Sequence, residues 1–481
     1  MRLSELLADM PVSVVGPDGA EVSGIQHDSR EIQPGDLFVA ARGRRHDGAR
    51  FAPDAVEGGA VAVLAASPPA GPVSVPWVVA ADPRGLMGQL AARLYAHPDR
   101  ELVMIGVTGT NGKTTCVWLL ESVLAAAGIP TGKIGTVETE FRELPLASAR
   151  TTPEAPDLLR FLRDLRGHGA AAVAMEVSSQ GLVLGRVQEI EFDVALFTQL
   201  TRDHLDFHGS MEAYFAAKRL LFDRLAPGGR GVVNVGCEWG RRLAAELEAP
   251  VTYGAGGDVQ ATDAELHEKG IRARLTTPRG ELTVESPLFG DYNLDNILAA
   301  AAVAEAMELP HEAVVEGVRR MRAVPGRMER VECGQRFLVY LDYAHTDDAL
   351  ERLYSAVRRL TGRTIVAVFG CPGERDAGKR ELMGRVAGRL ARRIVVTTDN
   401  PRSEDPLAIM AAVARGAREG GEAVVELVPD RAAAIRVAVD AAGDDDVVLV
   451  TGKGNETGQE VLEQILPFSD RDELERALRS R

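Results

Sequence analysis

The chain has 481 residues, of which 45% are hydrophobic and 26% are charged, and its formal net charge at pH 7 is −15. This composition excludes global disorder, and the acidic balance argues against a nucleic-acid binder that works through a broad basic surface. The four cysteines form no CxxC pair, which argues against a zinc ribbon or a disulfide framework and favours a reducing compartment. No signal peptide or membrane span is recognisable, so we expect a cytoplasmic protein.

Short β-branched runs alternate with Ala- and Leu-rich segments of helical period along the chain. This alternation predicts an α/β fold with parallel sheets. Breaks at 97–100 and 323–326 predict an N-terminal domain over 1–97, a central domain over 98–324 and a C-terminal domain over 325–481. The pattern predicts helices at 115–127 and 293–307 and buried strands at 103–107, 171–175, 194–197, 231–235, 364–369, 393–397 and 447–450.

Two polar loops are prominent in the first of these pieces. Residues 26–30 include Ser29, and residues 42–48 form a basic loop with three arginines and a histidine. A hydroxyl with neighbouring backbone N–H groups suits a diphosphate, and the basic loop adds local positive charge. An ordinary turn and a solvated basic loop are the alternatives.

A glycine-rich segment directly after the first strong strand, at 106–115, has the features of a phosphate-binding loop. Its glycines let backbone N–H groups turn toward phosphate, and the following helix N-terminus adds partial positive charge. Lys113 would contact the β- and γ-phosphates, and the Thr114 hydroxyl would bind Mg²⁺. Its spacing departs from the standard pattern because position 107 is Val. The candidate ATP-binding residues here are Gly109, Thr110, Asn111, Gly112, Lys113, Thr114 and Thr115.

Three later ionisable residues could complete a site for phosphoryl transfer. Glu176 ends a predicted strand, His204 lies in the ionisable segment 201–209, and Lys218 follows on a predicted helix. Oxygen and nitrogen ligands hold the Mg²⁺ that neutralises a triphosphate beside a carboxylate. Alone, each residue could be a capping Glu, a surface His or a solvated Lys; together, beside a phosphate loop, they favour a site.

The loop at 109–115 resembles the ATP loop of the Mur ligases, the amide-forming enzymes of peptidoglycan precursor synthesis. The resemblance extends through all three pieces and is closest to the MurE type. It implies a small N-terminal α/β domain that binds UDP, a central ATP-binding domain with a P-loop ATPase-like parallel sheet, and a C-terminal Rossmann-like domain that binds an amino acid. It also implies a cytoplasmic, monomeric ligase that serves cell-wall synthesis and uses ATP and Mg²⁺.

The resemblance assigns roles to further residues around ATP. Lys218 matches the lysine that the family carbamylates, so a cation becomes an oxygen ligand. Lys113, Lys218, His204 and Glu176 are the implied catalytic residues, and Thr114, Glu176, His204 and Lys218 as its carbamate are the implied Mg²⁺ ligands. The remaining implied ATP contacts are Asn293, Asn296, Arg327, Asp342 and His345.

The resemblance also implies two substrate sites. The UDP-sugar and dipeptide would contact Ser29, Thr151, Thr152, Ser178 and Arg186, and diaminopimelate would contact Arg375, Asp399, Asn400, Pro401, Arg402, Gly452 and Glu456. Arg402 offers a planar fork that suits a carboxylate, which meso-diaminopimelate carries at its far end and lysine does not. Four positions depart from the family pattern, namely Gln180, Leu184, Pro372 and Asn455.

The implied reaction adds meso-diaminopimelate to the D-glutamate γ-carboxylate of UDP-N-acetylmuramoyl-L-alanyl-D-glutamate through an acyl phosphate. The same ligase acting on L-lysine is one alternative, and Arg402 argues against it. A folylpolyglutamate synthetase-like ligase would share the ATP loop at 109–115, but the N-terminal piece over 1–97 argues against it. A nucleotide-binding regulatory protein with an inactive ligase site is a further alternative, against which the intact Lys113, Glu176, His204 and Lys218 argue.

Overall fold

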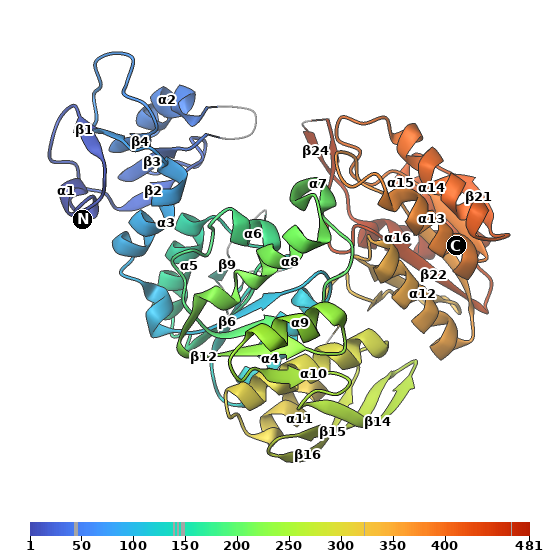
Figure 1. Ribbon diagram of the computed structural model, residues 1–481. Helices are drawn as coiled ribbons and strands as arrows, with labels where there is room; N and C mark the ends of the chain where they lie inside the picture. Colours follow the sequence, from blue (N-terminus) through green and yellow to red (C-terminus); the bar gives the residue numbers. More distant parts are fainter. Residues whose placement is uncertain (43–46, 138–139, 142–143, 146–149, 322, 463) are drawn as a thin grey trace. The chain divides into compact units, whose positions relative to one another are not determined.

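The computed structural model describes residues 1–42, 47–137, 140–141, 144–145, 150–321, 323–462 and 464–481 (Figure 1). The chain forms two compact units. The first comprises Met1–Gly106, Ile129–Ala195 and Leu220–Gly229, and the second comprises Val107–Gly128, Leu196–Arg219 and Arg230–Arg481. Every helix in the described ranges is too short or too polar to cross a membrane.

The first unit begins with a five-stranded sheet in the order β1-β5-β4-β3-β2, in which only β1 is antiparallel to its neighbour. All residues of β3 and β4 are buried, as expected for near-continuous apolar runs in a parallel sheet. The strands are β1 (Ser13–Val15), β2 (Gly24–Gln26), β3 (Asp36–Ala40), β4 (Ala62–Ala65) and β5 (Trp77–Val79), and the helices are α1 (Leu3–Leu6), α2 (Ala52–Glu57) and α3 (Pro83–Leu94).

The rest of the first unit contains the strands β11, β6, β10, β7, β8 and β9 in that order, with β7 and β10 parallel. The predicted strand at 171–175 is thus confirmed as β10, displaced by one residue. The strands are β6 (Val103–Thr108), β7 (Thr131–Ile134), β8 (Glu140–Phe141), β9 (Leu144–Pro145), β10 (Ala172–Glu176) and β11 (Phe192–Phe197), and the helices are α5 (Ala155–Gly167) and α6 (Ser179–Val183).

The second unit contains the ends of β6, β11 and β12 (Leu225–Asn234), which continue into it from the first, together with β13 (Val251–Tyr253). β12 and β13 are parallel. The helices of this part are α4 (Lys113–Ala126), α7 (Leu205–His208), α8 (Met211–Arg219), α9 (Glu238–Glu246), α10 (Asp291–Ala306) and α11 (His311–Arg320). α4 and α10 confirm the two helices that the sequence predicts at 115–127 and 293–307, within two residues at each end.

An antiparallel three-stranded sheet in the second unit lies outside the sequence prediction. Its strands are β14 (Gln260–His267), β15 (Gly270–Thr277) and β16 (Gly280–Ser286). Each turn ends in a glycine with positive φ, Gly270 at 146° and Gly280 at 135°. Alternate residues of β15 and β16 are buried, the pattern of a sheet with one solvated face.

A six-stranded sheet forms the C-terminal part of the second unit, in the order β17-β18-β22-β19-β20-β21. Only β17 is antiparallel to its neighbour. The elements, in chain order, are β17 (Glu329–Arg330), β18 (Leu338–Asp342), α12 (Asp347–Thr361), β19 (Thr364–Phe369), α13 (Lys379–Leu390), β20 (Arg393–Val396), α14 (Pro406–Gly420), β21 (Val424–Leu427), α15 (Arg431–Ala441), β22 (Asp446–Thr451), β23 (Gly458–Val461), β24 (Gln464–Pro467) and α16 (Asp470–Ser480).

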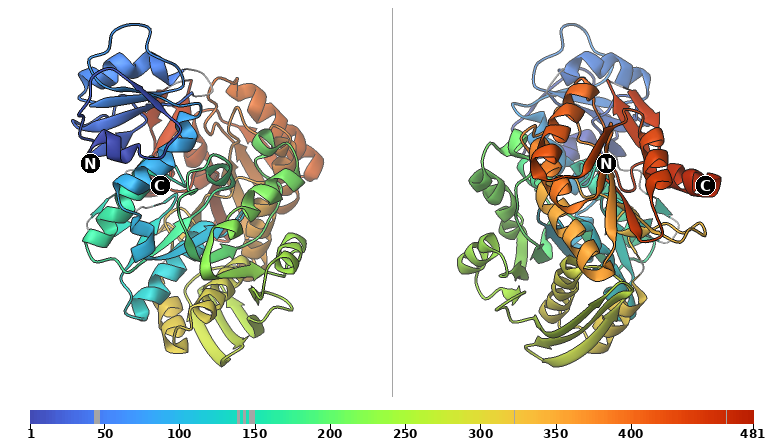
Figure 2. Two further views of the ribbon diagram at one scale, coloured as in Figure 1. Left: turned by 60° about the vertical axis from the view of Figure 1, so that its left-hand side comes forward. Right: turned by 90° about the vertical axis from the view of Figure 1, so that its right-hand side faces the viewer.

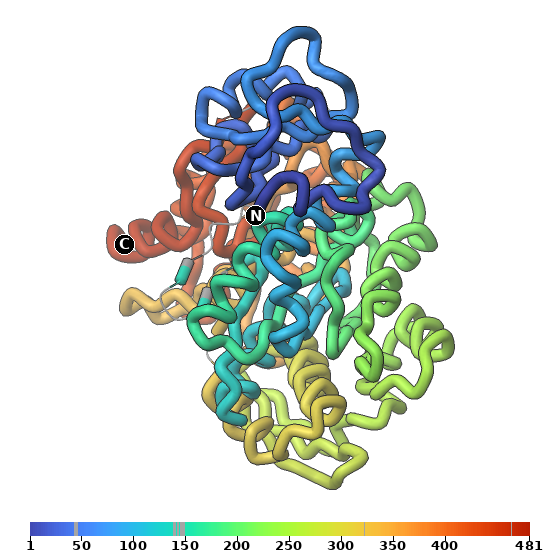
Figure 3. The backbone as a smooth tube through the Cα atoms, turned by 90° about the vertical axis from the view of Figure 1, so that its left-hand side faces the viewer, coloured from blue at the N-terminus to red at the C-terminus, as the bar shows by residue number. Residues whose placement is uncertain are grey.

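Helices cover both faces of this sheet. Alternate strand residues pack on α12, α13 and α14 on one face, and the intervening residues pack on α15 and α16 on the other. Figure 2 shows the helices of this part, and Figure 3 marks the chain end on α16. The parallel strands β18, β19, β20 and β22 end at one edge, so the loops at 343–346, 370–378, 397–405 and 452–457 emerge together.

Candidate active site

The glycine-rich loop connects β6 to α4 in the second unit, as the phosphate-loop prediction requires. Gly109 has φ 151° and Gly112 has φ 89°. A Cβ on Gly109 would overlap Thr198 Oγ1, and one on Gly112 would lie 2.5 Å from Asn296 Oδ1. Only glycine fits both places, because the backbone is left-handed and its neighbours leave no room for a side chain.

Lys113 opens α4 and folds back over the loop. Its Nζ donates to the carbonyl oxygens of Gly109 at 3.0 Å and Thr110 at 3.1 Å. Thr198, directly after β11, donates through Oγ1 to the Asn111 carbonyl at 2.6 Å, and this bond holds the loop against the end of that strand. The side chains of Thr114 and Thr115 are buried in the first turn of α4. A helix N-terminus and an ammonium group thus converge on one short loop, an arrangement that binds phosphate.

Lys218 lies on α8 and points into the same loop. Its side chain is buried, and Nζ donates to the Gly109 carbonyl oxygen at 2.7 Å. The nitrogen also lies 4.6 Å from the ring centroid of Tyr214, whose hydroxyl is 3.3 Å from Thr110 Oγ1. Burial, and secondarily the charge of Lys113, lower the pKa of Lys218 well below its usual value. A neutral amine is the form that can react with CO₂ to give a carbamate.

His204 lies between β11 and α7 in a left-handed conformation, with φ 53°. Its backbone N–H donates to Asp203 Oδ1 at 2.9 Å, and its Nε2 lies 3.4 Å from Asp203 Oδ2. Burial lowers the pKa of His204 to about 3, although Asp203 works in the opposite direction. The ring is therefore neutral near pH 7 and can offer a nitrogen lone pair to a metal ion.

The predicted ATP contacts from later in the chain also lie in the second unit. Asn296 accepts from Cys116 Sγ at 3.4 Å, and its Nδ2 donates to Asn293 Oδ1 at 2.9 Å. Arg327 Nη2 donates to Thr114 Oγ1 at 3.3 Å, and its guanidinium carbon lies 4.1 Å from the Tyr343 ring centroid. Arg327 thus contacts the phosphate loop directly, whereas Asn296 contacts Cys116 on α4 directly after the loop and Asn293 contacts Asn296.

Asp342 and His345 follow β18. The Asp342 carboxylate accepts the backbone N–H groups of Met328 and Ala344, each at 2.7 Å, and burial raises its pKa. His345 Nε2 lies 3.5 Å from Asp203 Oδ2. Asp203 therefore sits between His204 and His345. Burial raises the Asp203 pKa, but the hydrogen bond from His345 and the positive charges around it outweigh burial and lower the pKa overall.

The remaining predicted residues of the nucleotide and dipeptide sites lie in the first unit. The buried Glu176 carboxylate at the end of β10 accepts from Thr136 N at 2.8 Å. Thr152 Oγ1 lies 3.0 Å from the Glu176 carbonyl oxygen and accepts from the Ser178 backbone N–H at 2.9 Å. Thr151 Oγ1 is 3.0 Å from Thr136 Oγ1. Glu176, Thr151, Thr152 and Ser178 thus form one cluster.

Arg186 joins this cluster through a buried carboxylate. Its Nη1 donates to the Thr152 carbonyl at 3.1 Å, and its guanidinium pairs with Glu154 at 3.0 Å. Arg84 and Arg150 pair with the same carboxylate at 3.2 Å and 2.9 Å. Burial raises the Glu154 pKa, but the charges of the three arginines outweigh burial and lower it. Three cations around one carboxylate leave local positive charge that suits an anionic substrate.

Ser29 is half-buried in the turn after β2, beside an exposed ion pair of Arg30 with Asp28. The predicted basic loop at 42–48 lies partly outside the described residues, which omit 43–46. The diphosphate assignment for these loops stays a prediction.

The predicted amino-acid site is built on the carboxyl edge of the six-stranded sheet. Asn400 Nδ2 donates to Glu456 Oε2 at 3.0 Å, and the buried Lys453 donates to Asn400 Oδ1 at 2.9 Å and Glu456 Oε2 at 2.6 Å. Arg402 Nε donates to Glu460 Oε2 at 2.8 Å. These bonds tie the loop after β20 to the segment from β22 to β23.

The other predicted diaminopimelate contacts differ in burial and in their hydrogen bonds. Asp399 is buried and accepts from the Asn400 backbone N–H at 2.7 Å. Gly452 has φ 111°, and a Cβ there would lie 2.9 Å from Asp399 Oδ2. Pro401 is buried, whereas Arg375 is exposed. The structure therefore brings all of them except Arg375 into one packed cluster.

Sequence reasoning missed several residues that hold these sites together. Tyr214 contacts Lys218, and Asp203 contacts His204. Lys453 and Glu460 bond to the charged and polar side chains of the predicted amino-acid site. Glu154 pairs with three arginines. Weak signals existed: Tyr214 lies four residues before Lys218 on one helix, so both face the same side. For Glu460, no sequence signal indicated its partner, because Arg402 is 58 positions away.

Among the described residues, no group of three or more His, Cys, Asp or Glu side chains is arranged to hold a metal ion. The donor set expected for Mg²⁺ is different, since ATP itself supplies phosphate oxygens. The buried Thr114 hydroxyl, the His204 ring with its lowered pKa and the Lys218 amine with its lowered pKa, all in the second unit, fit such a site, the last after carbamylation.

Comparisons with known proteins agree over the whole chain. Three family descriptions match it: "Mur ligase family, catalytic domain" over 21–95, "Mur ligase middle domain" over 107–304 and "Mur ligase, glutamate ligase domain" over 326–454. The chain is similar to the UDP-N-acetylmuramoyl-L-alanyl-D-glutamate--2,6-diaminopimelate ligase of Streptomyces coelicolor, with 46% identity over 98% of this chain and 96% of the relative. The Solibacter usitatus ligase of the same name is 43% identical over 98% and 97%.

Solved structures give the same result. A ligase of that name aligns with a TM-score of 0.66 and 31% identity, covering 100% of this chain and 99% of the other. A MurF ligase from Thermotoga maritima in complex with ADP aligns with a TM-score of 0.68 at 19% identity, covering 95% and 96%, a likeness of fold alone.

Proposed function

The chain belongs to the Mur ligase family, and on this premise we propose that it is an ATP-dependent ligase that joins meso-diaminopimelate to UDP-N-acetylmuramoyl-L-alanyl-D-glutamate. The bond formed is an amide between the D-glutamate γ-carboxyl group and an amine of diaminopimelate. The observation that carries the proposal is that one unit holds both a phosphate-binding loop, with Lys113 and Lys218 on its carbonyls, and an amino-acid cradle with Arg402 and Glu456.

The proposed reaction has two steps. An oxygen of the γ-carboxylate attacks the γ-phosphorus of ATP, and ADP leaves. The amine then attacks the acyl carbon, phosphate leaves, and the departing phosphate takes up the proton that the nitrogen loses. Lys113 and the N-terminus of α4 stabilise the negative charge of the phosphates, and Arg327 holds the Thr114 hydroxyl at the same point. The chain's work is largely positioning and charge stabilisation.

Bound Mg²⁺ supplies positive charge that neutralises the phosphate oxygens. Thr114, His204 and the Lys218 carbamate are the proposed ligands in the second unit. Glu176 lies in the first unit, and its role as a ligand stays a prediction. We assign Asn293, Asn296, Asp342 and His345 to ATP.

The proposed dipeptide contacts are those of the first-unit cluster, namely Thr151, Thr152, Ser178 and Arg186, with Ser29 toward the UDP. The proposed diaminopimelate contacts are Asp399, Asn400, Pro401, Arg402, Gly452 and Glu456, with Arg375 at the periphery. Arg402 would bind the far carboxylate and Glu456 the ammonium group. Lysine lacks that carboxylate, so it would leave Arg402 without its substrate partner.

We also propose domain boundaries at 97/98 and 324/325, because one sheet lies within 13–79 and another within 329–451. A cytoplasmic location and a monomeric state belong to the same proposal.

The test is phosphate release with ATP, Mg²⁺ and UDP-N-acetylmuramoyl-L-alanyl-D-glutamate, with meso-diaminopimelate, L-lysine or no amino acid, and mass detection of the product. We expect release and a tripeptide product with diaminopimelate, and only very slow turnover of L-lysine, measurable at high lysine concentration. Equal use of lysine would contradict the role of Arg402. Tight ATP binding without product from either amino acid would instead favour the regulatory alternative.

A further inference from the structure

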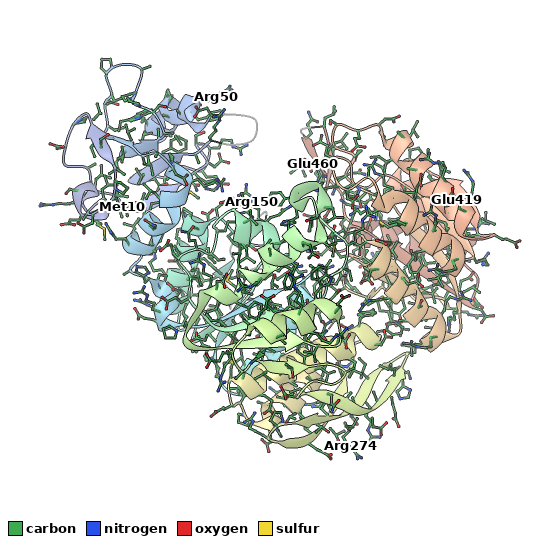
Figure 4. All side chains as sticks on the ribbon, in the orientation of Figure 1. Met10, Arg50, Arg150, Arg274, Glu419 and Glu460 are labelled. Carbon is green, nitrogen blue, oxygen red and sulfur yellow. The ribbon has the colours of Figure 1, made fainter. Side chains whose placement is uncertain are left out.

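We infer that Glu460 is a positioning residue that aims the Arg402 guanidinium at the far carboxylate of the amino-acid substrate and so sets the preference for a dicarboxylic amino acid. The inference rests on the proposed function, in which Arg402 binds that carboxylate. Glu460 lies on β23, outside the loops that the sequence points to, and is labelled in Figure 4.

The orientation of Arg402 is held by two contacts from different segments. Its Nε donates to Glu460 Oε2 at 2.8 Å, and its Nη1 donates to the Gly373 carbonyl oxygen at 2.5 Å. Because a guanidinium group is planar, one bond at Nε and one at Nη1 define both the position of the plane and its rotation. The Arg402 side chain is only 16% exposed, so few other orientations are open to it.

The pairing leaves part of the Arg402 fork for a ligand. Glu460 bonds through a single oxygen at Nε, and within the described residues no partner of Nη2 is found. A guanidinium carries five N–H donors, so the Nη2 group can receive a carboxylate while Glu460 stays in place. The geometry thus indicates that Glu460 supports the binding of the substrate carboxylate by Arg402 and does not compete with it for the Nη2 donors.

The backbone around Arg402 and Glu460 is built to keep them together. Arg402 N donates to the Glu460 carbonyl at 3.1 Å, and Leu462 N donates to the Arg402 carbonyl at 2.8 Å. Arg402 has φ 53°, a left-handed conformation that a non-glycine residue adopts at a cost, and these bonds maintain it.

Asn400 connects this pair to the other end of the amino-acid site. Its Oδ1 accepts the Glu460 backbone N–H at 2.9 Å, and its Nδ2 donates to Glu456 at 3.0 Å. Lys453 donates to Asn400 Oδ1 at 2.9 Å, so Asn400 links the Arg402–Glu460 pair to Glu456 and Lys453 at the other end of the site.

The experiment compares Glu460→Ala and Glu460→Gln with the wild-type chain in steady-state assays that vary each substrate in turn. The amide oxygen of Gln can still accept from Arg402 Nε, so Glu460→Gln should stay near wild type. Glu460→Ala should raise the KM for meso-diaminopimelate about tenfold, the loss expected for one charge-assisted hydrogen bond, with kcat little changed. The KM values for ATP and the UDP-dipeptide should not change.

L-lysine provides a readout that general damage to the protein would not reproduce. Because lysine has no far carboxylate, kcat/KM for it should be the same in Glu460→Ala and the wild type, and the preference for diaminopimelate should fall about tenfold. The matched control is Glu419→Ala, which removes the carboxylate of an exposed pair with Arg385 at 2.9 Å on the same domain and should alter none of these constants.

A lower KM for diaminopimelate in Glu460→Ala would overturn the inference, because it would mean that Glu460 competes with the substrate for Arg402. An unchanged KM would overturn it too. If Glu460→Ala does not fold, Glu460→Met takes its place with the same expectations, because Met keeps the length of the side chain but its thioether is only a weak hydrogen-bond acceptor. If the wild type itself forms no product, the proposed function fails, an outcome distinct from a failure of Glu460 alone.

Discussion

The Lys218 amino nitrogen lies 2.7 Å from the main-chain carbonyl oxygen of Gly109, so a helix residue and the phosphate-binding loop meet at one hydrogen bond. The contact places a buried amine of lowered pKa beside the Lys113 ammonium group, which itself donates to the same carbonyl oxygen at 3.0 Å. Two charged lysine amino groups that donate to the same carbonyl oxygen repel each other, unless one of them is neutral or becomes an anion. Carbamylation of Lys218 would convert the repulsion into an attraction.

Lys218→Ala is therefore expected to lower kcat at least about 100-fold, because a group that stabilises the transferred phosphoryl charge is lost. Added short carboxylates should restore part of the activity. The modification itself can be detected by ¹³C NMR after incubation with labelled bicarbonate. Arg219→Ala, which changes the next helix residue and its exposed pair with Glu246, is the control and should keep full activity. Undiminished turnover of Lys218→Ala without added carboxylate would remove the carbamate from the mechanism.

Gly112→Ala should weaken ATP binding by more than tenfold. Its Cβ would lie 2.5 Å from Asn296 Oδ1, so the loop or Asn296 must move. Gly128→Ala at the other end of α4 is the matched control: its φ is 78°, close to the 89° of Gly112, but nothing lies within 4 Å of its Cβ. Both variants should lose about 1–2 kcal/mol of stability from the left-handed backbone, and only Gly112→Ala should lose ATP affinity in calorimetric titration. Equal affinities would argue that this loop does not contact the nucleotide.

The Arg431–Asp470 pair, which joins α15 to α16, should be very sensitive to the loss of one partner. Both side chains are fully buried, and Arg431 Nη2 also donates to the Thr451 carbonyl at 3.0 Å, directly before the loop at 452–457. Asp470→Ala leaves an unpaired buried guanidinium and should cost about 3–5 kcal/mol in urea unfolding. Arg479→Ala breaks an exposed pair on the same helix, α16, and should cost less than about 1 kcal/mol. Similar losses for the two variants would mean that burial does not govern the energetics here.

The Glu154 carboxylate should make the stability of the protein depend on pH in the acid range. Its pKa is lowered in the folded state, because the charges of Arg186, Arg84 and Arg150 outweigh the effect of burial. A depressed folded pKa contributes stability that is complete above the unfolded pKa of about 4.3 and is lost as pH falls through the folded value.

The difference in unfolding free energy between the wild type and Glu154→Gln should therefore be largest near pH 7 and shrink below about pH 4. Chemical unfolding at a series of pH values measures it. Glu212→Gln, at an exposed carboxylate, should show no such trend. A difference that stays constant down to acid pH would show that the three arginines do not act through the charge of Glu154.

Much of this architecture was predictable because its signals are local. Buried parallel strands are short apolar runs, so β10, β19, β20 and β22 were found within one or two residues. The phosphate loop was predictable because Gly109, Gly112 and Lys113 act through backbone conformations and bonds a few residues apart. The antiparallel sheet at 260–286 was missed because its strands alternate polar with apolar residues and are therefore less apolar than a buried strand.

The amino-acid sequence by itself determined the family, and it predicted the phosphate loop and the charged residues of the proposed amino-acid site. Only the tertiary structure decided which groups those residues meet: Lys218 with Gly109, Glu154 with three arginines, and Arg402 with Glu460. The physical reason is that a charged side chain takes its pKa and its orientation from neighbours in space. In a parallel sheet, those neighbours come from strand ends that are separated by whole helices in the chain.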